Sequence, residues 1–169
     1  MSLPLIPDYR VSSIYELTPE AVKRLGKKLV LADLDNTLAR YRQKEPDQAL
    51  IEWKRRLNEA GITVFILSNG RKPHRSRRFA EAFRVDFVSH AGKPGSGGFR
   101  TALERTGCSP RQALMVGDQI FTDIWGANRM GITSVLTRPI ALDTVFRRLR
   151  YGVETPFRSL CPHGEGLES

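Results

Sequence analysis

The chain has 169 residues, of which 40% are hydrophobic, so it is long enough for one domain with a substantial core and too short for two comfortable ones. Lysine and arginine outnumber aspartate and glutamate by 27 to 18, and the net charge of +9 suggests a negatively charged partner or substrate without distinguishing nucleic acid, an anionic membrane surface and a phosphorylated small molecule. No segment has the roughly 18 apolar residues of a membrane span, and Cys108 and Cys161 lack the spacing of a zinc site or a disulfide framework, so we expect a cytoplasmic protein that is at most peripheral at a membrane.

Segments with strand and helix patterns alternate along the chain. Thr18 and Pro19 are typical of a helix start, and the short helix that follows leads into an apolar run at 29–32, which is typical of a strand buried on both faces. Further strands are expected at 62–67, 85–88, 113–117 and 131–135, and further helices at 47–60, 73–83, 99–106, about 120–130 and 141–150. This order predicts an α/β fold, in which a doubly wound parallel sheet of about five strands lies between two layers of helices.

We expect these elements to form a single domain with three parts. Residues 1–28 form a helical lead-in packed on the core, residues 29–150 form the core, and residues 151–169 form a C-terminal extension. The extension is expected to be partly flexible, with a frayed tail from Cys161 onward.

Two carboxylates follow the first buried strand, in the segment DLDNT at 33–37. Asp33 comes directly after the strand, Asp35 lies two residues later, and Thr37 follows. One carboxylate can attack phosphorus, and a second beside it can protonate the leaving group and later activate water, provided that the extended chain breaks into a turn between them. An Asx-type turn that caps the next segment is an equal alternative for this motif alone. A calcium loop is excluded, because Leu38 and Lys44 occupy the positions that require Gly and Glu.

The next two strands are also followed by residues that can bind phosphate. Ser68 and Asn69 follow the second strand and offer a hydroxyl and an amide, and Lys93 lies in the glycine-rich loop AGKPGSGG after the third. A cation on a tight loop can neutralise a phosphoryl group in transfer. Taken singly, these residues are also typical of an ordinary turn and of a solvated lysine.

The fourth strand ends in a second acidic motif, GDQIFTD at 117–123. Asp118 follows the strand and Asp123 lies at the start of the next expected helix, where a carboxylate can also serve as a helix cap. Together with Asp33, Asp118 would build an all-oxygen site for a hard cation, of which Mg²⁺ is the favoured one. Because the two strands are expected to flank the topological switch point of the sheet, Asp33 and Asp118 should face each other across it.

These four motifs, in this order, resemble those of the haloacid dehalogenase (HAD) superfamily, which has a three-layer Rossmann-like fold. The resemblance implies that Asp33 is the nucleophile and a Mg²⁺ ligand, and that Asp35 is the general acid and base and a metal ligand through its backbone carbonyl. It also implies that Asp118 is a metal ligand. The resemblance further implies that Ser68, Asn69 and Lys93 bind phosphate. Thr37 and Asp123 would support the site.

Two features refine the resemblance. Asp35 indicates the phosphatase branch, because dehalogenases and P-type ATPases lack an aspartate at that position. The segment LIPDYRVSSIYELT ahead of DLDNTL, together with GDQIFTDIWGAN, is similar to the YqeG family of small HAD phosphatases (subfamily IIIA). Relatives of that family include a mitochondrial enzyme that dephosphorylates phosphatidylglycerophosphate, and the resemblance extends to this substrate only by extrapolation.

The spacing of the motifs leaves no room for a cap domain. Only 30 residues separate Thr37 from Ser68, and 23 separate Asn69 from Lys93, which is enough for a helix and part of a strand in each case. Capped HAD enzymes close over small metabolites and exclude water. An open site therefore favours a large phosphorylated substrate, such as a lipid head group, a phosphoprotein or a nucleic-acid end.

Basic residues gather at 71–78 and 147–150, which are expected to be helical. These helices either contact an anionic membrane or are simply solvated, and the lack of interleaved aromatic residues makes nucleic acid the less favoured partner. Two alternatives to a Mg²⁺-dependent phosphatase remain: a HAD-like module that binds an anionic partner without turnover, and a nucleic-acid processing protein. The sequence leaves the oligomeric state open.

Overall fold

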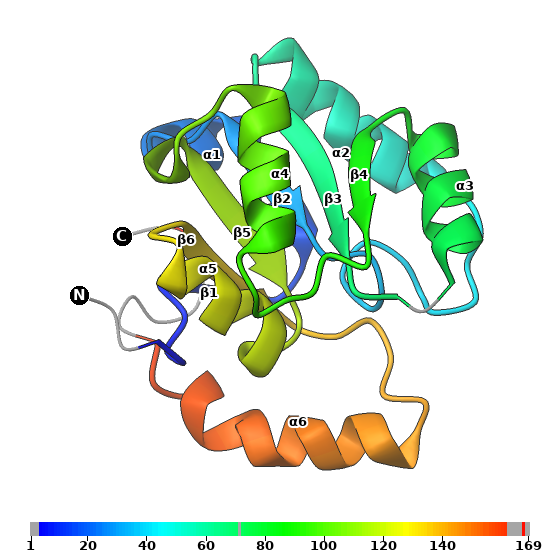
Figure 1. The fold of residues 1–169 in the computed structure, drawn as a ribbon, viewed down its shortest axis with the longest axis vertical. Helices are drawn as coiled ribbons and strands as arrows, with labels where there is room; N and C mark the ends of the chain where they lie inside the picture. The colour runs from blue at the N-terminus through cyan, green and yellow to red at the C-terminus, as the bar shows by residue number, and fades with distance from the viewer. Residues whose placement is uncertain (1–3, 71, 162–166, 168–169) are drawn as a thin grey trace.

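A computed structural model describes residues 4–70, 72–161 and 167. All strand pairs in its six-stranded sheet are parallel, in the order β1-β6-β5-β2-β3-β4 (Figure 1). The strands are β1 Tyr9–Val11, β2 Leu29–Ala32, β3 Thr63–Ser68, β4 Asp86–Ser89, β5 Ala113–Gly117 and β6 Thr133–Thr137. The helices are α1 Pro19–Arg24, α2 Gln48–Glu59, α3 Pro73–Phe83, α4 Gly97–Thr106, α5 Trp125–Arg129 and α6 Val145–Arg158, with short 3₁₀ turns at Ile14–Glu16 and Pro110–Gln112 and a π-helical turn at Ile120–Ile124.

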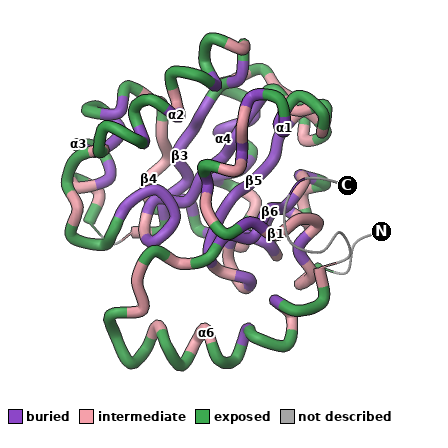
Figure 2. The backbone as a smooth tube through the Cα atoms, turned by 180° about the vertical axis from the view of Figure 1, so that it is seen from behind, coloured by how far each residue is buried: buried purple, intermediate pink, exposed green. Residues whose placement is uncertain are grey.

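The sheet lies between two helical layers because its side chains alternate between two apolar clusters. Val30 and Ala32 of β2 face a cluster that includes residues of α1, α2 and α3, whereas Leu29 and Leu31 face a cluster that includes residues of α4 and α5. The inner strands β2, β3, β5 and β6 are accordingly among the most continuously buried parts of the chain in Figure 2. The predicted α/β class and doubly wound arrangement are confirmed.

The sheet has one strand more than predicted. β1 is only three residues long, with the sequence YRV, so it has no continuous apolar run that would predict a strand. It becomes a strand by pairing with β6, and Asp8 beside it accepts a hydrogen bond from the backbone N–H of Ser134 at 2.9 Å. The N-terminal lead-in therefore extends the sheet as well as supplying α1, whose predicted Thr18 cap and Pro19 start are both present.

The last helix differs most from its expected position. It was predicted at 141–150, but α6 begins at Val145 and runs through residue 150, where the sequence places the end of the core, to Arg158. Thr144 caps its first turn. Of the tail predicted to fray from Cys161, residues 162–166 and 168–169 lie outside the described residues, while Leu167 is buried in the core. None of the helices in the described part of the chain has the length and hydropathy needed to cross a bilayer.

Trp53 should anchor the N-terminal segment to α2. Its buried indole N–H donates to the backbone carbonyl of Leu17 at 3.0 Å. We expect Trp53→Phe to lower the free energy of unfolding by about 1–3 kcal/mol, because the carbonyl loses its partner and the smaller ring leaves a void. Urea denaturation measures this loss. Trp125→Phe, at the other and less buried tryptophan, is the matched control and should change stability by less than about 0.5 kcal/mol; equal effects would show that Trp53 is not an anchor.

Candidate active site

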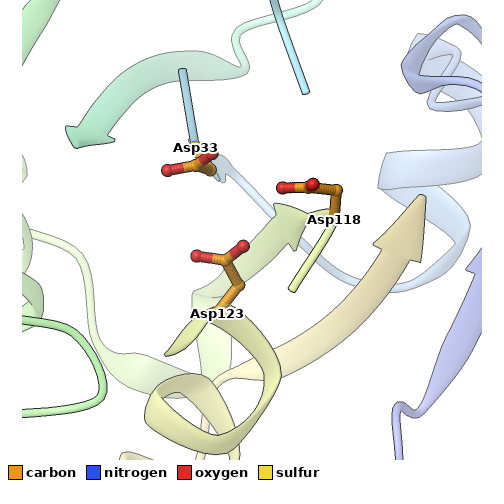
Figure 3. Close-up of side chains that lie close together, drawn as sticks. All are labelled: Asp33, Asp118 and Asp123. Carbon is orange, nitrogen blue, oxygen red and sulfur yellow. The ribbon is translucent and has the colours of Figure 1, made fainter. Parts of the chain in front are cut away.

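The site begins where β2 and β5 end side by side. Ala32 pairs with Val116 in the parallel register, and the backbone N–H of Asp33 donates to the carbonyl of Val116 at 3.0 Å. Asp33 and Asp118 therefore emerge from neighbouring strands at the carboxyl edge of the sheet, and Figure 3 shows their carboxylates turned toward each other. The predicted meeting of these two residues across the switch point is present in the structure.

The chain turns sharply after Asp33. The backbone N–H groups of Leu38 and Ala39 both donate to the carbonyl of Leu34, and Asn36 has a φ of 65°, in the left-handed region. This turn is the break in the extended chain that the sequence requires. It sends the side chain of Asp35 toward α3, where Oδ1 forms an ion pair with Arg75 at 2.6 Å.

Lys93 is the cation of the site. Its side chain is 1% exposed, and Nζ lies 2.7 Å from Oδ1 of Asp33, 2.7 Å from Oδ1 of Asp123 and 2.7 Å from the carbonyl oxygen of Leu67. The contacts with Asp33 and Leu67 are hydrogen bonds, and the contact with Asp123 is an ion pair. Lys93 is therefore a fixed charge in the site rather than a solvated loop residue.

Asn69 holds the loop that carries Lys93. Its amide Nδ2 donates to the backbone carbonyl of Lys93 at 2.8 Å, and its Oδ1 accepts from the backbone N–H of Lys93 at 3.0 Å. These two bonds show that Asn69 positions the Lys93 loop, and its predicted contact with phosphate stays a prediction. Ser68 lies at the end of β3, where its hydroxyl oxygen accepts from the backbone N–H of Gly70 at 3.0 Å and lies 3.3 Å from the hydroxyl of Ser76.

Asp123 completes the acidic cluster from the π-helical turn after β5. Its Oδ2 accepts from the backbone N–H of Gln119 at 3.2 Å. The carboxylate packs against the Cα of Gly117, and a Cβ at that position would lie 2.2 Å from Oδ2. The glycine before Asp118 is therefore required for Asp123 to reach Lys93. Thr37 makes a longer contact, 3.5 Å from its hydroxyl to Oδ1 of Asp118.

The cluster has three carboxyl groups and one ammonium group. Burial raises the pKa of Asp33 to about 7, against the lowering effect of Lys93 and with further repulsion from Asp123 and Asp35. Burial also raises the pKa of Asp118 well above its usual range, and the carboxylates of Asp33 and Asp123 add to the shift. Burial lowers the pKa of Lys93, but Asp123 and Asp33 outweigh that effect and raise it.

This charge imbalance fits a divalent cation. Asp33, Asp118 and Asp123 are all buried and each offers a carboxylate oxygen within 4.8 Å of the others. Oxygen ligands suit hard cations, and a cation would relieve the repulsion that otherwise keeps these carboxyl groups from ionising together. The residues present thus fit a metal site, with Asp123 shared between the cluster and Lys93.

Sequence reasoning missed two residues that hold the Asp118 loop in place. Arg158 of α6 donates to the backbone carbonyl of Asp118 and forms a buried ion pair with Glu154 at 2.7 Å. Glu154 in turn accepts from the backbone N–H of Phe121 at 3.3 Å. The only local signal was a Glu and Arg spaced four apart, which is typical of any exposed helix.

Two hollows adjoin the site, and arginine or lysine side chains line both of them. One, of about 510 Å³, lies between α6 and the loops at the carboxyl edge, and Asp118 is part of its wall. The second, of about 880 Å³, shares Tyr41 and Arg42 with the first and extends along the start of α3. The Tyr41 ring lies between these helices, 4.9 Å from the Arg147 guanidinium and 5.7 Å from the Arg75 guanidinium. The cationic residues around the two hollows are Arg42, Lys44, Lys72, Arg75, Arg78, Arg147, Arg150 and Arg158.

Comparison with known proteins assigns the family. The protein named Probable phosphatase YqeG of Bacillus subtilis is 35% identical to this chain over 136 residues, which are 80% of this chain and 78% of that protein. The chain belongs to the YqeG-like phosphatases of the HAD superfamily. A family model described as HAD-hydrolase-like matches residues 90–139, which include Lys93, Asp118 and Asp123. The resemblance stated from the motifs is confirmed, and this YqeG-like phosphatase is a hydrolase of phosphoric monoesters.

Two further similarities bear on substrate and fold. Phosphatidylglycerophosphate phosphatase 1 of Arabidopsis thaliana is 30% identical over 145 residues, which are 81% of this chain but only 42% of that protein, so the chain spans less than half of that relative. The crystal structure of 3-deoxy-D-manno-octulosonate 8-phosphate phosphatase from Yersinia pestis covers 82% of this chain and 83% of its own, with a TM-score of 0.54 and 14% identity. The second likeness concerns the fold alone.

The acidic cluster should make the stability of the metal-free protein depend on pH. Because the folded-state pKa of Asp33 is raised from 3.8 to about 7, folding favours the protonated carboxyl group. This contribution to stability is complete below the unfolded-state pKa and is lost as the pH rises through about 7. We therefore expect thermal denaturation in EDTA to give a melting temperature that falls as the pH rises from 3.8 to about 7.

Mg²⁺ should reverse this fall, because a cation stabilises the ionised carboxylates. Asp33→Asn should flatten the pH dependence in EDTA and remove the Mg²⁺ effect. Asp86→Asn, at an exposed carboxylate on β4, is the control and should behave as the wild type. The same pH dependence in Asp33→Asn and wild type would contradict this account of the cluster.

Proposed function

We propose that this YqeG-like phosphatase is a Mg²⁺-dependent phosphomonoesterase that works through an aspartyl phosphate on Asp33. The observation that carries the proposal is the setting of Asp33 at the carboxyl end of β2, where its carboxylate lies 2.7 Å from the Lys93 ammonium and faces Asp118. A carboxylate in such a setting can act as a nucleophile while neighbouring groups carry the charge of the phosphoryl oxygens.

The two steps need one nucleophile and one proton carrier. In the first step an oxygen of Asp33 bonds to phosphorus, the bond from phosphorus to the ester oxygen breaks, and Asp35 gives its proton to that oxygen. In the second step Asp35 takes a proton from water, whose oxygen attacks phosphorus and breaks the bond to Asp33. Inorganic phosphate leaves, and both aspartates return to their starting states.

The other residues hold charge and position during these steps. Lys93 keeps Asp33 in one orientation and offsets the negative charge near it, while the Ser68 hydroxyl at the end of β3 is placed to bind a phosphoryl oxygen. Mg²⁺ bound by Asp33, Asp118 and the backbone carbonyl of Asp35 would supply further positive charge to the phosphoryl group. Asp123 keeps Lys93 in place.

Arg75 positions the proton carrier. Its guanidinium donates to Asp35 at 2.6 Å and also to the backbone carbonyls of Arg40 at 2.8 Å and Gln43 at 3.1 Å. The arginine thus ties the turn after β2 to α3. With three carbonyl or carboxylate partners, it fixes where Asp35 lies relative to Asp33.

The surroundings of the site support a large anionic substrate linked to a lipid. Only α2 and its flanking loops lie between β2 and β3, so no cap covers the site in the described part of the chain. The 880 Å³ hollow beside it is lined with arginine and lysine and by no acidic residue, which favours a substrate with negative charge beyond the phosphate to be removed. The Arabidopsis relative is named for phosphatidylglycerophosphate, and we propose this lipid as the substrate of the YqeG-like phosphatase.

Removal of the nucleophile should abolish turnover and leave the fold intact. We expect Asp33→Asn to lower kcat for p-nitrophenyl phosphate and for phosphatidylglycerophosphate by at least about a thousandfold in the presence of Mg²⁺. Asp86→Asn is again the matched control, and circular dichroism reports the fold. A wild-type rate in Asp33→Asn would rule out the aspartyl phosphate, whereas hydrolysis of the aryl phosphate alone would rule out the lipid substrate.

Loss of the Arg75 ion pair should slow the chemistry more than it weakens binding. For Arg75→Gln we expect kcat to fall about tenfold with little change in KM for p-nitrophenyl phosphate, because Asp35 is no longer held. Arg77→Gln, at an exposed arginine of the same helix, keeps the overall charge change and should leave kcat unaltered. If both variants lose the same activity, the effect comes from net charge and not from the position of Asp35.

A further inference from the structure

The apolar face of the amphipathic helix α6 points away from the core. Its apolar side chains point to solvent, with exposed fractions of 81% for Val145, 67% for Phe146, 66% for Leu149 and 56% for Val153. These positions fall on one face at helical spacing. In Figure 1 the helix lies at the periphery of the protein, and in Figure 2 most of its length is exposed.

The polar face of α6 is the one turned inward. Glu154 is fully buried and Arg158 nearly so, and together they bond to the backbone of the Asp118 loop. Rolling the helix to bury its apolar face would break this buried ion pair and expose or strand both charges. The inward contacts therefore fix the outer face in its exposed orientation.

An apolar face of this kind is normally covered by another surface. Among the described residues, none packs over Val145, Leu149 or Val153, which stay more than half exposed. The positive charge near this apolar face indicates which kind of surface covers it. Arg148 lies exposed at the edge of the apolar face, and the chain carries a net charge of +9.

An anionic lipid surface matches this combination, whereas a second copy of the chain does not. Two copies meeting through the same face would bring their Arg148 side chains and their positive fields together. A helix with apolar residues on one face and arginine at its margin is the pattern of helices that lie in the plane of a bilayer interface, with the arginine reaching the lipid phosphates.

We propose that the outer face of α6 docks into the interfacial region of an anionic bilayer and holds the site beside the lipid head groups. The helix lies across the carboxyl ends of the strands, where the site is (Figure 1), and one wall of the 510 Å³ hollow consists of its residues. Docking through this face would leave the inward contacts with the Asp118 loop intact. The inference concerns membrane binding and holds whichever phosphomonoester is the substrate.

Vesicle flotation of the full chain tests the proposal without any turnover. We expect the wild type to float with phosphatidylcholine vesicles that contain phosphatidylglycerol and to remain unbound with phosphatidylcholine alone. The double variant Leu149→Gln with Val153→Gln should bind at least about tenfold more weakly, since two aliphatic side chains no longer enter the interface. Ile51→Gln, at an exposed apolar residue of α2, is the matched control and should float as the wild type.

The charge of the surface is tested in the same assay. Arg148→Gln should weaken flotation with the anionic vesicles more than Arg100→Gln, a change of equal charge at an exposed position on α4. All these variants should hydrolyse p-nitrophenyl phosphate at the wild-type rate, which separates a loss of docking from a loss of the site. A double variant that floats as well as the wild type would overturn the proposal. So would a wild type that ignores anionic vesicles and forms a dimer that the double variant disrupts.

Discussion

The buried ammonium of Lys93 is the interaction on which the rest of the site depends. A charge in this position is tolerated only because Asp33, Asp123 and the carbonyl of Leu67 surround it at 2.7 Å each. These partners come from the ends of β2 and β3 and from the turn after β5, and the lysine itself is held by Asn69. One cation thus joins the carboxyl ends of three strands, and the acidic cluster beside it is left short of positive charge.

The need of the acidic cluster for further positive charge relates the site to the surface around it. The cluster fits a divalent cation, arginines line the 510 Å³ hollow beside it, and α6 forms one wall of this hollow while its apolar face points outward. The inward and outward faces of α6 have different tasks. Glu154 and Arg158 fix the loop that carries Asp118, whereas Val145 and Leu149 are mostly exposed to solvent. The same helix therefore supports the site and offers the surface by which we propose that the enzyme reaches its substrate.

Much of the site could be predicted because parallel strands align their ends. The apolar runs that become β2 and β5 stop at Asp33 and Asp118, and adjacent strands in a doubly wound sheet bring such residues together whatever the rest of the sequence. Asn69 shows the limit of this reasoning. Its place after β3 was predicted, but its two hydrogen bonds to the backbone of Lys93 were not, because they depend on where a loop 24 residues later folds back.

The sequence by itself determined the α/β class, the family, the order of the motifs and the residues that meet at the carboxyl edge. These features depend on local apolar periodicity and on chain order. Only the tertiary structure decided that β1 joins the sheet, that Arg75 binds Asp35, and that α6 turns its charged face inward to Asp118. Each of these is a contact between segments far apart in the chain, made by residues whose local pattern is that of an ordinary turn or exposed helix. Packing and charge in three dimensions determine their partners, and the spacing of residues along the chain does not predict them.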